Sequence, residues 1–334
     1  MRAGDIEYHM PETLPQACAL LSAHGAAAAL LAGGTDVVSA LKHGVLGARH
    51  LVSLKRIPGL SEVSRESDGG LTIGALVKLC EVAESAAVRS VCAALAEAAG
   101  QAGSPLLRNR GTLGGNVCLE TRCWFYNQNE SWRASRPPCL KAGGDQCYVN
   151  RTQNQCVALF SADTPAALIT GRARVRLAGP RGERSLPIED LYSSDGLRPL
   201  TRENGEILTA VTLPAPRPRS GSAYLKYSVR ESIDFPVLGI AASVALDSNG
   251  GIGDLRLAVT GVKTAPMRLV EFEAALRDRA VPRENDAGLA GIASRTLGTL
   301  YLTDTVPHKR HVAGLMAVEA VCRAAAAARD GRAA

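Results

Sequence analysis

The chain has 334 residues, enough for two or three domains, and its 46% of hydrophobic and 21% of charged residues are those of an ordinary globular protein. Its net charge of +6 comes from 38 basic residues scattered among 32 acidic ones, with no basic run interleaved with aromatic side chains. This composition excludes a wholly disordered chain and argues against a nucleic-acid partner.

The N-terminal residues, MRAGDIEYHMPETL, contain no apolar core segment, so we expect no signal peptide. The most apolar stretch, residues 26–31, is far too short to span a bilayer. The sequence therefore predicts a soluble, cytoplasmic protein that acts without a membrane. Its nine cysteines are not expected to form disulfides in that compartment. Five of the nine fall between residues 118 and 156, and this clustering suggests a metal site.

The first elements in chain order have β/α character. Residues 12–24 carry apolar side chains at helical spacing, and Gly25 ends this predicted helix. A short buried strand follows and runs into Gly33 and Gly34, with a helix predicted to begin near Asp36.

A second strand is predicted at residues 50–57, and residues 60–76 alternate around an Asp-Gly-Gly turn, which indicates a hairpin. Residues 78–101 are alanine-rich and helical. Residues 173–191 predict another hairpin, and the strand expected at 206–213 leads into a Pro/Ser/Gly break, the best domain boundary in the chain.

The C-terminal part has a different pattern of predicted strands and helices. Three apolar strands form a predicted antiparallel meander, and three helices follow it. The strands are expected near 223–230, 235–246 and 252–262, and the helices near 265–278, 284–297 and 308–329. The apolar face of the last helix is interpreted as core packing.

Two glycine-rich stretches share one pattern. Residues 30–38 read LLAGGTDVV and residues 108–116 read RNRGTLGGN, so each places two adjacent glycines near a threonine. Glycine lets backbone N–H groups approach an anion closely, and the threonine adds a hydroxyl donor. Neither stretch is a G-x-G-x-x-G motif or a P-loop, and an ordinary turn explains either one alone about equally well. Together they could hold both phosphates of one dinucleotide.

A third stretch, residues 161–168, reads SADTPAAL. Asp163 precedes Thr164 and Pro165 and so could cap a helix. Its carboxylate could equally hold a ribityl hydroxyl or the edge of a flavin ring. The sequence leaves both alternatives open.

The three stretches together resemble the FAD-binding subunit of the molybdenum hydroxylases, and the resemblance covers nearly the whole chain. It implies an α+β fold in which two N-terminal α/β subdomains, residues 1–57 and 58–220, form an FAD site. A C-terminal domain, residues 221–334, would close the site with a three-stranded antiparallel sheet and helices.

The resemblance also implies a set of cofactor-binding residues. The glycine stretches would hold the pyrophosphate and nearby ribityl groups, Asp163 would contact the flavin, and Leu208 would lie beside the isoalloxazine ring. Lys226 would lie near the ring, although a strand lysine with its amine in solvent is an equal alternative. The full set is Leu30, Leu31, Ala32, Gly33, Gly34, Thr35, Asp36, Val37, Thr112, Leu113, Gly114, Gly115, Asn116, Asp163, Leu208 and Lys226.

An insert of about forty residues, near 119–160, separates the strand expected after the second glycine stretch from Asp163. It has almost no apolar periodicity, so a metal centre rather than a core would order it. Its cysteines, Cys123, Cys139, Cys147 and Cys156, are separated by 15, 7 and 8 residues. Because no two of these four cysteines form a Cys-x2–4-Cys knuckle with each other, this spacing favours an iron–sulfur cluster over zinc, with inert cysteines a third alternative.

The other cysteines are interpreted as packed residues rather than ligands: Cys118 on the expected strand, and Cys18, Cys80, Cys92 and Cys322 in helical stretches. Within the family, the insert resembles that of one branch, the β subunit of 4-hydroxybenzoyl-CoA reductase, which binds a 4Fe–4S cluster. The four insert cysteines would then be its ligands, and the cofactors would be FAD and 4Fe–4S.

This branch implies an electron-transfer subunit. Electrons from reduced ferredoxin would pass the 4Fe–4S cluster and FAD, then a 2Fe–2S small subunit and a molybdopterin-binding large subunit, for reductive dehydroxylation to benzoyl-CoA in anaerobic aromatic degradation. The assembly would be a dimer of heterotrimers, and this chain would contribute no catalytic residue. Two alternatives stay open: the FAD subunit of an oxidising molybdenum hydroxylase, and a zinc-stabilised flavin-binding scaffold.

Overall fold

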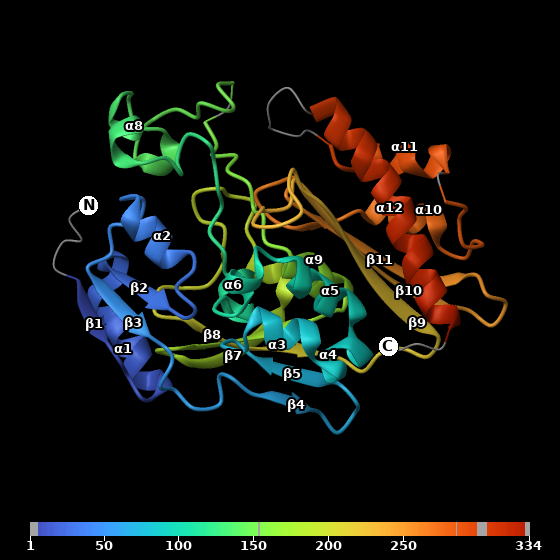
Figure 1. Ribbon diagram of the computed structural model, residues 1–334, viewed down its shortest axis with the longest axis horizontal. Helices are drawn as coiled ribbons and strands as arrows, with labels where there is room; N and C mark the ends of the chain where they lie inside the picture. Colours follow the sequence, from blue (N-terminus) through green and yellow to red (C-terminus); the bar gives the residue numbers. More distant parts are fainter. Residues whose placement is uncertain (1–5, 153, 285, 299–305, 331–334) are drawn as a thin grey trace.

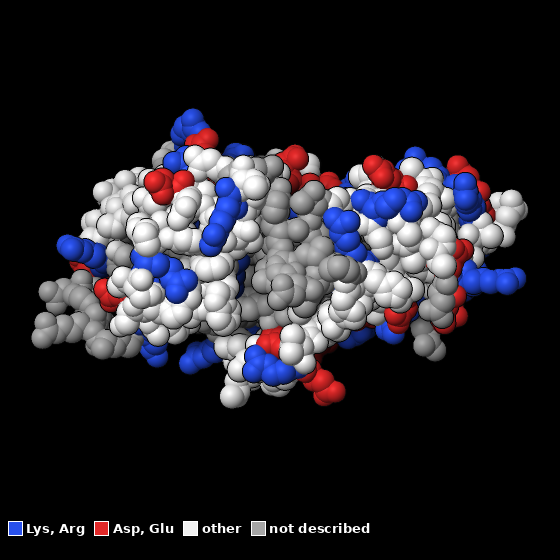
Figure 2. All heavy atoms as spheres, turned by 90° about the horizontal axis from the view of Figure 1, so that it is seen from above, with Lys and Arg blue, Asp and Glu red and all other residues white. Residues whose placement is uncertain are grey.

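The computed structural model describes residues 6–152, 154–284, 286–298 and 306–330. The described chain forms three sheets, with strand orders β1-β3-β2, β4-β5-β8-β6-β7 and β12-β11-β10-β9 (Figure 1). Charged groups of both signs lie side by side on the face drawn in Figure 2, in keeping with the scattered charge of the sequence.

The first sheet is parallel, with β3 (His50–Ser53) between β1 (Glu7–His9) and β2 (Ala28–Leu31). The predicted first helix is α1 (Leu14–His24), which begins at a Thr13 cap and ends at Gly25, where a 3-10 turn, Gly25–Ala27, leads into β2. α2 (Val37–Lys42) follows the first glycine stretch. Ala17, Cys18 and Leu21 of α1 pack on Val52 of β3, because the apolar face of the helix must cover the sheet.

The second sheet is antiparallel and contains both predicted hairpins. One pairs β4 (Val63–Arg65) with β5 (Leu71–Gly74), and the other pairs β6 (Arg174–Gly179) with β7 (Gly182–Pro187). The predicted strand at 206–213 is β8 (Ile207–Leu213), which lies between β5 and β6 and joins the two hairpins. A 3-10 turn, Ile188–Leu191, follows β7.

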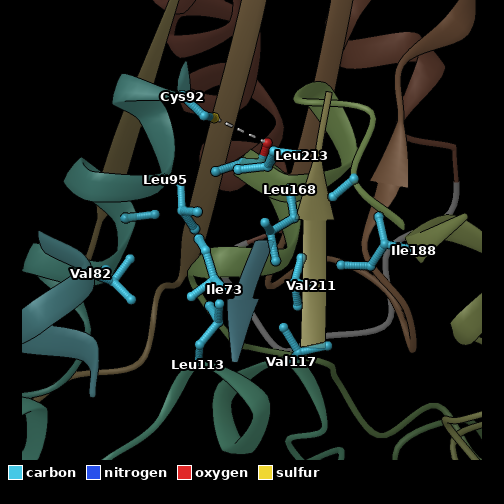
Figure 3. Packing of buried hydrophobic residues seen from close by; sticks show 14 of the residues in the cluster. Ile73, Val82, Cys92, Leu95, Leu113, Val117, Leu168, Ile188, Val211 and Leu213 are labelled. Atoms are coloured by element: carbon cyan, nitrogen blue, oxygen red, sulfur yellow. Dashed lines mark hydrogen bonds between the residues drawn. The ribbon is translucent and has the colours of Figure 1, made fainter. Parts of the chain in front are cut away.

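Short helices cover this second sheet. They are α3 (Leu79–Glu84), α4 (Ala86–Val91), α5 (Ala93–Gln101), α6 (Pro105–Arg108), α7 (Leu113–Val117) and α9 (Thr164–Thr170). Figure 3 shows the core between them and the sheet, where Ile73 and Val211 of the strands face Leu95, Leu113 and Leu168 of the helices.

The C-terminal sheet has four antiparallel strands instead of the three expected. They are β9 (Ser220–Tyr227), β10 (Leu238–Leu246), β11 (Ile252–Thr260) and the two-residue β12 (Met267–Arg268). The extra strand occupies the start of the helix predicted at 265–278, so that helix, α10 (Val270–Leu276), begins later. The other two helices are α11 (Ala287–Thr296) and α12 (Val306–Arg329).

Helix α12 is the one helix among the described residues that is long and apolar enough to span a membrane by length and composition. It packs along β9 and β10, with Ala317, Val318, Val321 and Ala324 fully buried. Its apolar character is therefore explained by the core that it covers.

The insert contains a short helix, α8 (Glu130–Ala134), and a 3-10 turn, Leu140–Ala142, but no extended sheet. Its two ends are joined by paired backbone hydrogen bonds between Arg122 and Leu159, of 2.7 and 2.8 Å. In Figure 1, α8 lies beyond α2, away from the second sheet. The insert thus projects from the base where it leaves and re-enters the fold.

The close contact between β9 and α12 yields a stability prediction. A Cβ atom added at Gly221 would lie 2.4 Å from the Ala324 carbonyl oxygen and 2.5 Å from the Ala328 nitrogen, both backbone atoms of α12. Gly221→Ala should therefore lower the free energy of unfolding by about 1–3 kcal/mol, the usual cost of overpacking. Urea unfolding followed by circular dichroism measures it.

Gly253 of β11 is the matched control, because a Cβ there would meet its nearest atoms at 3.5 Å, an ordinary contact. Gly253→Ala should change the free energy of unfolding by less than about 1 kcal/mol. Equal stability of the two variants would contradict the proposed backbone contact.

Candidate functional site

A cavity of about 560 Å³ lies where the first sheet, the second sheet and the loop between β9 and β10 meet. This size is within the usual range for ligand sites. Its wall includes the loop between β2 and α2, the start of α7, the base of the insert, Asp163 and Leu208. Segments from all three predicted domains therefore contribute to one concave site.

The first glycine stretch and the second lie against each other. A Cβ atom on Gly33 would be 2.0 Å from the Arg110 carbonyl oxygen, so only glycine permits this approach. Gly34 has a φ of +80°, in the left-handed region that favours glycine. The backbone N–H groups of Gly34, Thr35 and Asp36 donate no hydrogen bond to any residue that the structure describes, and they line the cavity. Three consecutive free donors form a cradle for an anion.

The second glycine stretch forms the short helix α7 and not the expected strand. The Thr112 hydroxyl accepts a hydrogen bond from the Gly115 N–H at 3.1 Å, and this cap starts the helix. The Leu113 and Gly114 N–H groups donate to the carbonyls of Val77 and Ala75, at 2.9 and 2.8 Å. These donors are therefore used for docking the loop and are not available to a ligand.

Gly114 and Gly115 differ in what they face. A Cβ on Gly114 would lie 2.7 Å from the Ala75 Cβ, so Gly114 permits close packing of α7 on the second sheet. A Cβ on Gly115 would meet only the Thr112 hydroxyl, at 3.1 Å, and Gly115 lines the cavity. Gly115 is consequently the glycine of this stretch whose missing side chain leaves room for a ligand.

Asp163 is buried, with 3% of its surface exposed, and makes no helix-capping hydrogen bond. The capping alternative is therefore wrong. The Tyr224 hydroxyl donates to its carboxylate at 2.9 Å, and the Lys226 amine lies 3.0 Å from the same oxygen. Burial raises the pKa of Asp163 from 3.8 to about 6, although Lys226 and Tyr224 both act to lower it.

The Asn116 side chain, and not that of Asp163, caps the start of helix α9. Its side-chain oxygen accepts hydrogen bonds from the Thr164 N–H at 3.1 Å and from the Thr164 hydroxyl at 2.6 Å. This link ties the end of α7 to the first residue of α9 and places Asp163 at the cavity wall.

Most of the predicted cofactor residues line this cavity. The exceptions are Leu31, Leu113 and Lys226. Leu113 lies in the second-sheet core with no exposed surface. The Lys226 amine points away from solvent and donates to the carbonyls of Gln101 and Asp234, at 2.8 and 2.9 Å. Lys226 therefore holds Asp163 from behind rather than contacting the cavity itself.

Sequence reasoning missed the contribution of the insert base to this cavity. Arg122 forms an ion pair with Asp36, and its guanidinium lies 4.5 Å from the centre of the Phe235 ring. Both partners line the cavity, as does Arg122. No local pattern marks residue 122, because its partners come from a loop 86 residues earlier and from the loop between β9 and β10.

The four insert cysteines surround a second, smaller cavity, together with Phe125, Tyr126, Lys141 and Tyr148. Cys118 is not among them; it follows α7 and lines the larger cavity. Burial raises the pKa of Cys123 to about 11, with Cys139 and Cys156 adding to the effect. Such thiols stay neutral unless a bound cation offsets the charge of the thiolates, as a coordinated metal does.

The spacing of the sulfurs limits what they can bind. Among the described residues, one group of His, Cys, Asp or Glu side chains has all of its ligand atoms within 4.8 Å of one another. It consists of three histidines elsewhere in the fold and includes no cysteine. A tetrahedral zinc with Zn–S bonds of about 2.3 Å holds its sulfurs about 3.8 Å apart. No three of the insert sulfurs lie within 4.8 Å of one another, and in a multi-iron centre each thiolate needs to reach only a different iron.

Two residues connect the cavities. Tyr126 lines both of them, and its hydroxyl donates to the Val45 carbonyl at 3.3 Å. The Lys141 side chain is 6% exposed, and its amine donates to Glu120, to Thr121 and to the Gly196 carbonyl at 2.6–2.8 Å. The amine also lies 5.4 Å from the centre of the Tyr126 ring. The wall between the cavities is thus one aromatic ring beside a buried cation.

Comparisons with known proteins agree with this arrangement. A family model of the FAD binding domain in molybdopterin dehydrogenase matches residues 4–216, and one of the CO dehydrogenase flavoprotein C-terminal domain matches residues 223–324. The xanthine dehydrogenase FAD-binding subunit of Escherichia coli O157:H7 is 30% identical over 267 residues, which cover 80% of this chain and 77% of that protein. The carbon monoxide dehydrogenase medium chain of Hydrogenophaga pseudoflava is 28% identical and covers 83% of this chain and 82% of its own.

Solved structures show the same likeness. A chain of carbon monoxide dehydrogenase from Hydrogenophaga pseudoflava is 27% identical, with a TM-score of 0.77, and the match covers 98% of this chain and 99% of that chain. The similarity confirms the predicted α+β fold class over nearly the whole chain.

The environment of Asp163 predicts a pH-dependent stability. Between pH 4 and 6 the folded protein holds a proton on Asp163 that the unfolded chain has lost, so the wild type loses stability as pH rises through this window. Asp163→Asn removes this titration. The free energy of unfolding of the wild type minus that of the variant should therefore fall by on the order of 3 kcal/mol from pH 4 to pH 7.

Urea unfolding of both proteins across this pH range measures the difference. A rise in place of the fall would mean that the Lys226 ion pair outweighs the burial of the carboxylate. Lys141→Met, which removes a buried amine elsewhere, serves as the control. It should leave the pH dependence of the free energy of unfolding between pH 4 and pH 7 unchanged.

Proposed function

The chain belongs to the family of FAD-binding subunits of molybdopterin dehydrogenases, and we propose that its larger cavity holds the FAD. The observation that carries this assignment is the row of free N–H groups at Gly34, Thr35 and Asp36 beside the open position at Gly115. A dinucleotide carries a negatively charged pyrophosphate, which fits free backbone donors on a wall without side chains.

The residues present fit the rest of such a ligand. The Asp163 carboxylate is fixed by Tyr224 and Lys226, so its orientation is set before a ligand arrives. It can accept a hydrogen bond from a hydroxyl or ring N–H. Leu208, which is 4% exposed, supplies an apolar surface in the same cavity. Bound FAD would supply one- and two-electron transfer, while the protein fixes its position and surroundings.

The loop between β2 and α2 and the insert base hold the opposite wall. Arg122 neutralises Asp36, which otherwise would place a free carboxylate beside the anion cradle. Phe235 covers the Arg122 guanidinium from the β9–β10 loop. These contacts orient the wall.

The relatives support a function as one subunit of a larger complex. Those reported above are named as an FAD-binding subunit and a medium chain of dehydrogenases. We propose that this chain likewise works with a molybdopterin-binding large subunit and a 2Fe–2S small subunit. The names of these relatives favour the oxidising alternative, in which electrons leave a substrate and reach the FAD, over reductive dehydroxylation of 4-hydroxybenzoyl-CoA.

The cysteine cavity favours a second candidate function. Four cysteines surround one space, no three of their sulfurs lie within 4.8 Å of one another, and Tyr126 lines both that space and the proposed FAD site. We propose that Cys123, Cys139, Cys147 and Cys156 bind a 4Fe–4S cluster that exchanges electrons with the FAD. The comparisons support FAD and do not bear out the cluster, so this proposal depends on the cavity alone.

A cluster beside the FAD would give the chain a second redox centre and a port for a low-potential donor such as ferredoxin. That port is what the reductive reaction of 4-hydroxybenzoyl-CoA reductase requires. An oxidising complex needs an exit toward an acceptor instead. A cluster in the purified subunit would therefore favour the reductive direction.

Gly115 provides a test of the FAD site that disturbs the fold less than the other buried glycines of the site would. Valine at Gly33 or Gly114 would strike protein backbone or Ala75, whereas Gly115 lines the cavity and an added Cβ would meet only the Thr112 hydroxyl, at 3.1 Å. We expect Gly115→Val to fold with a modest loss of stability and to lose FAD affinity at least tenfold, measured by flavin fluorescence after reconstitution.

Gly47→Val is the matched control, because Gly47 is exposed and has no atom within 4 Å of an added Cβ. It should retain full FAD affinity. Retention of full affinity by Gly115→Val would sink the assignment of this cavity.

The cysteines predict the content of metal and sulfide. Cys139→Ser or Cys147→Ser should abolish about four iron and four acid-labile sulfide per subunit while FAD stays bound, because the free donors at Gly34 and Thr35 lie outside the insert. Cys80→Ser, in α3 and outside both cavities, should change nothing. Zinc without sulfide in the wild type would instead support the scaffold alternative.

A further inference from the structure

Three histidines that no cofactor assignment uses lie together at the first sheet. His9 is the last residue of β1, His24 is the last residue of α1, and His50 is the first residue of β3. They are 15 and 26 residues apart in the sequence and form no recognisable motif. The parallel pairing of β1 with β3, in which Glu7 lies opposite His50, and the return of α1 over the sheet bring them together.

Their ring nitrogens form a compact group. One nitrogen from each ring lies within 4.8 Å of the others, and the His9 Nε2 is 3.1 Å from the His50 Nδ1. The rings of His24 and His50 are stacked, with centres 3.6 Å apart. The Glu7 carboxylate lies beside them, 3.3 Å from the His50 Nδ1 and 3.8 Å from the His9 Nε2.

The three histidines differ from ordinary surface side chains in their low exposure and in their contacts. The His9 and His50 side chains are only 15% and 20% exposed. The ring of His24 has no hydrogen bond to any part of the chain that the structure describes, although it stacks on both other rings. Protonation of all three imidazoles would bring positive charges into contact beside a single carboxylate.

We propose that His9, His24 and His50 form a binding site for a divalent transition metal of the zinc class, with Glu7 or water completing the coordination. Neutral imidazoles offer their lone pairs to Zn²⁺, Cu²⁺ or Ni²⁺ and are poor ligands for Mg²⁺ and Ca²⁺, which prefer oxygen. Three histidines with an open fourth position form an established type of zinc site. Side-chain rotations would draw the nitrogens from within 4.8 Å to the about 3.4 Å that Zn–N bonds of about 2.1 Å require.

A metal at this place would act as a cross-link. It would tie the three-residue edge strand β1 to the end of α1 and to β3, across segments far apart in the chain. His50 is paired with Ala28 of β2, and Ala28 and Gly25 line the larger cavity. The metal would therefore stabilise the sheet that carries the loop between β2 and α2. This stabilisation would appear in unfolding because only the folded chain assembles the site.

The test is a Zn²⁺ titration of the purified subunit at pH 7.5 against a chromophoric chelator, combined with thermal unfolding. Because the free cysteines offer other ligands to zinc, single variants identify the site. His24→Gln and His50→Gln should each lose one equivalent of zinc or bind it at least 100-fold more weakly. They should also lose the zinc-induced rise in Tm.

His43→Gln is the matched control. His43 is exposed at the end of α2, where its ring bonds the Ser39 carbonyl, and it lies outside the trio. It should bind zinc as the wild type does. Mg²⁺ should not raise Tm, because it prefers oxygen ligands.

Equal zinc stoichiometry and affinity in the wild type and both trio variants would overturn the proposal. X-ray absorption at the zinc edge keeps the result decisive if a variant folds poorly. Wild-type protein with one zinc should show nitrogen and oxygen ligands at about 2.0–2.1 Å, and a purely sulfur shell at about 2.3 Å would equally overturn it.

Discussion

The docking of the two glycine loops is the constraint on which the cavity depends. At Gly33 the chain passes so close to the Arg110 carbonyl that no side chain fits, and Gly114 makes a similar approach to Ala75. These contacts lock the first sheet onto the second and leave the Gly34, Thr35 and Asp36 N–H groups at the cavity without a hydrogen-bond partner among the described residues. The missing side chains of these glycines thus determine how the protein packs, and this packing in turn forms the site for a ligand.

The C-terminal sheet contributes a hydroxyl and a charged amine to the site, in addition to part of its shape. Tyr224 and Lys226 both project from β9 onto Asp163, which precedes α9 of the neighbouring domain. A buried carboxylate is tolerated only where such partners compensate its lost hydration. The network therefore joins two domains and presents one fixed acceptor to the cavity, while Lys226 itself stays behind it.

The insert is connected to both cavities by a few residues near its base. Arg122 reaches Asp36 and Phe235 in the larger cavity, and Tyr126 forms part of both walls. The order of the segment depends on these contacts, on the bridge between Arg122 and Leu159, on the packing of Phe125 against Trp132 and Tyr148 and on whatever the four cysteines hold. A ligand change in one cavity thus has a direct structural route to the other.

The sequence by itself determined α1, both hairpins, the three long strands of the last sheet, the break before β9 and the family resemblance, because apolar periodicity and turn residues act over short distances. It also singled out the glycine stretches and the insert cysteines. Only the tertiary structure decided that the second glycine stretch is helical, that Lys226 stands behind Asp163, and that a short β12 extends the last sheet. The tertiary structure alone also decided that Arg122 pairs with Asp36 and that three histidines, His9, His24 and His50, lie together. Lys226 with Asp163, Arg122 with Asp36 and the three histidines each join residues distant in the chain, and such contacts are set by how the elements pack, which no local pattern records.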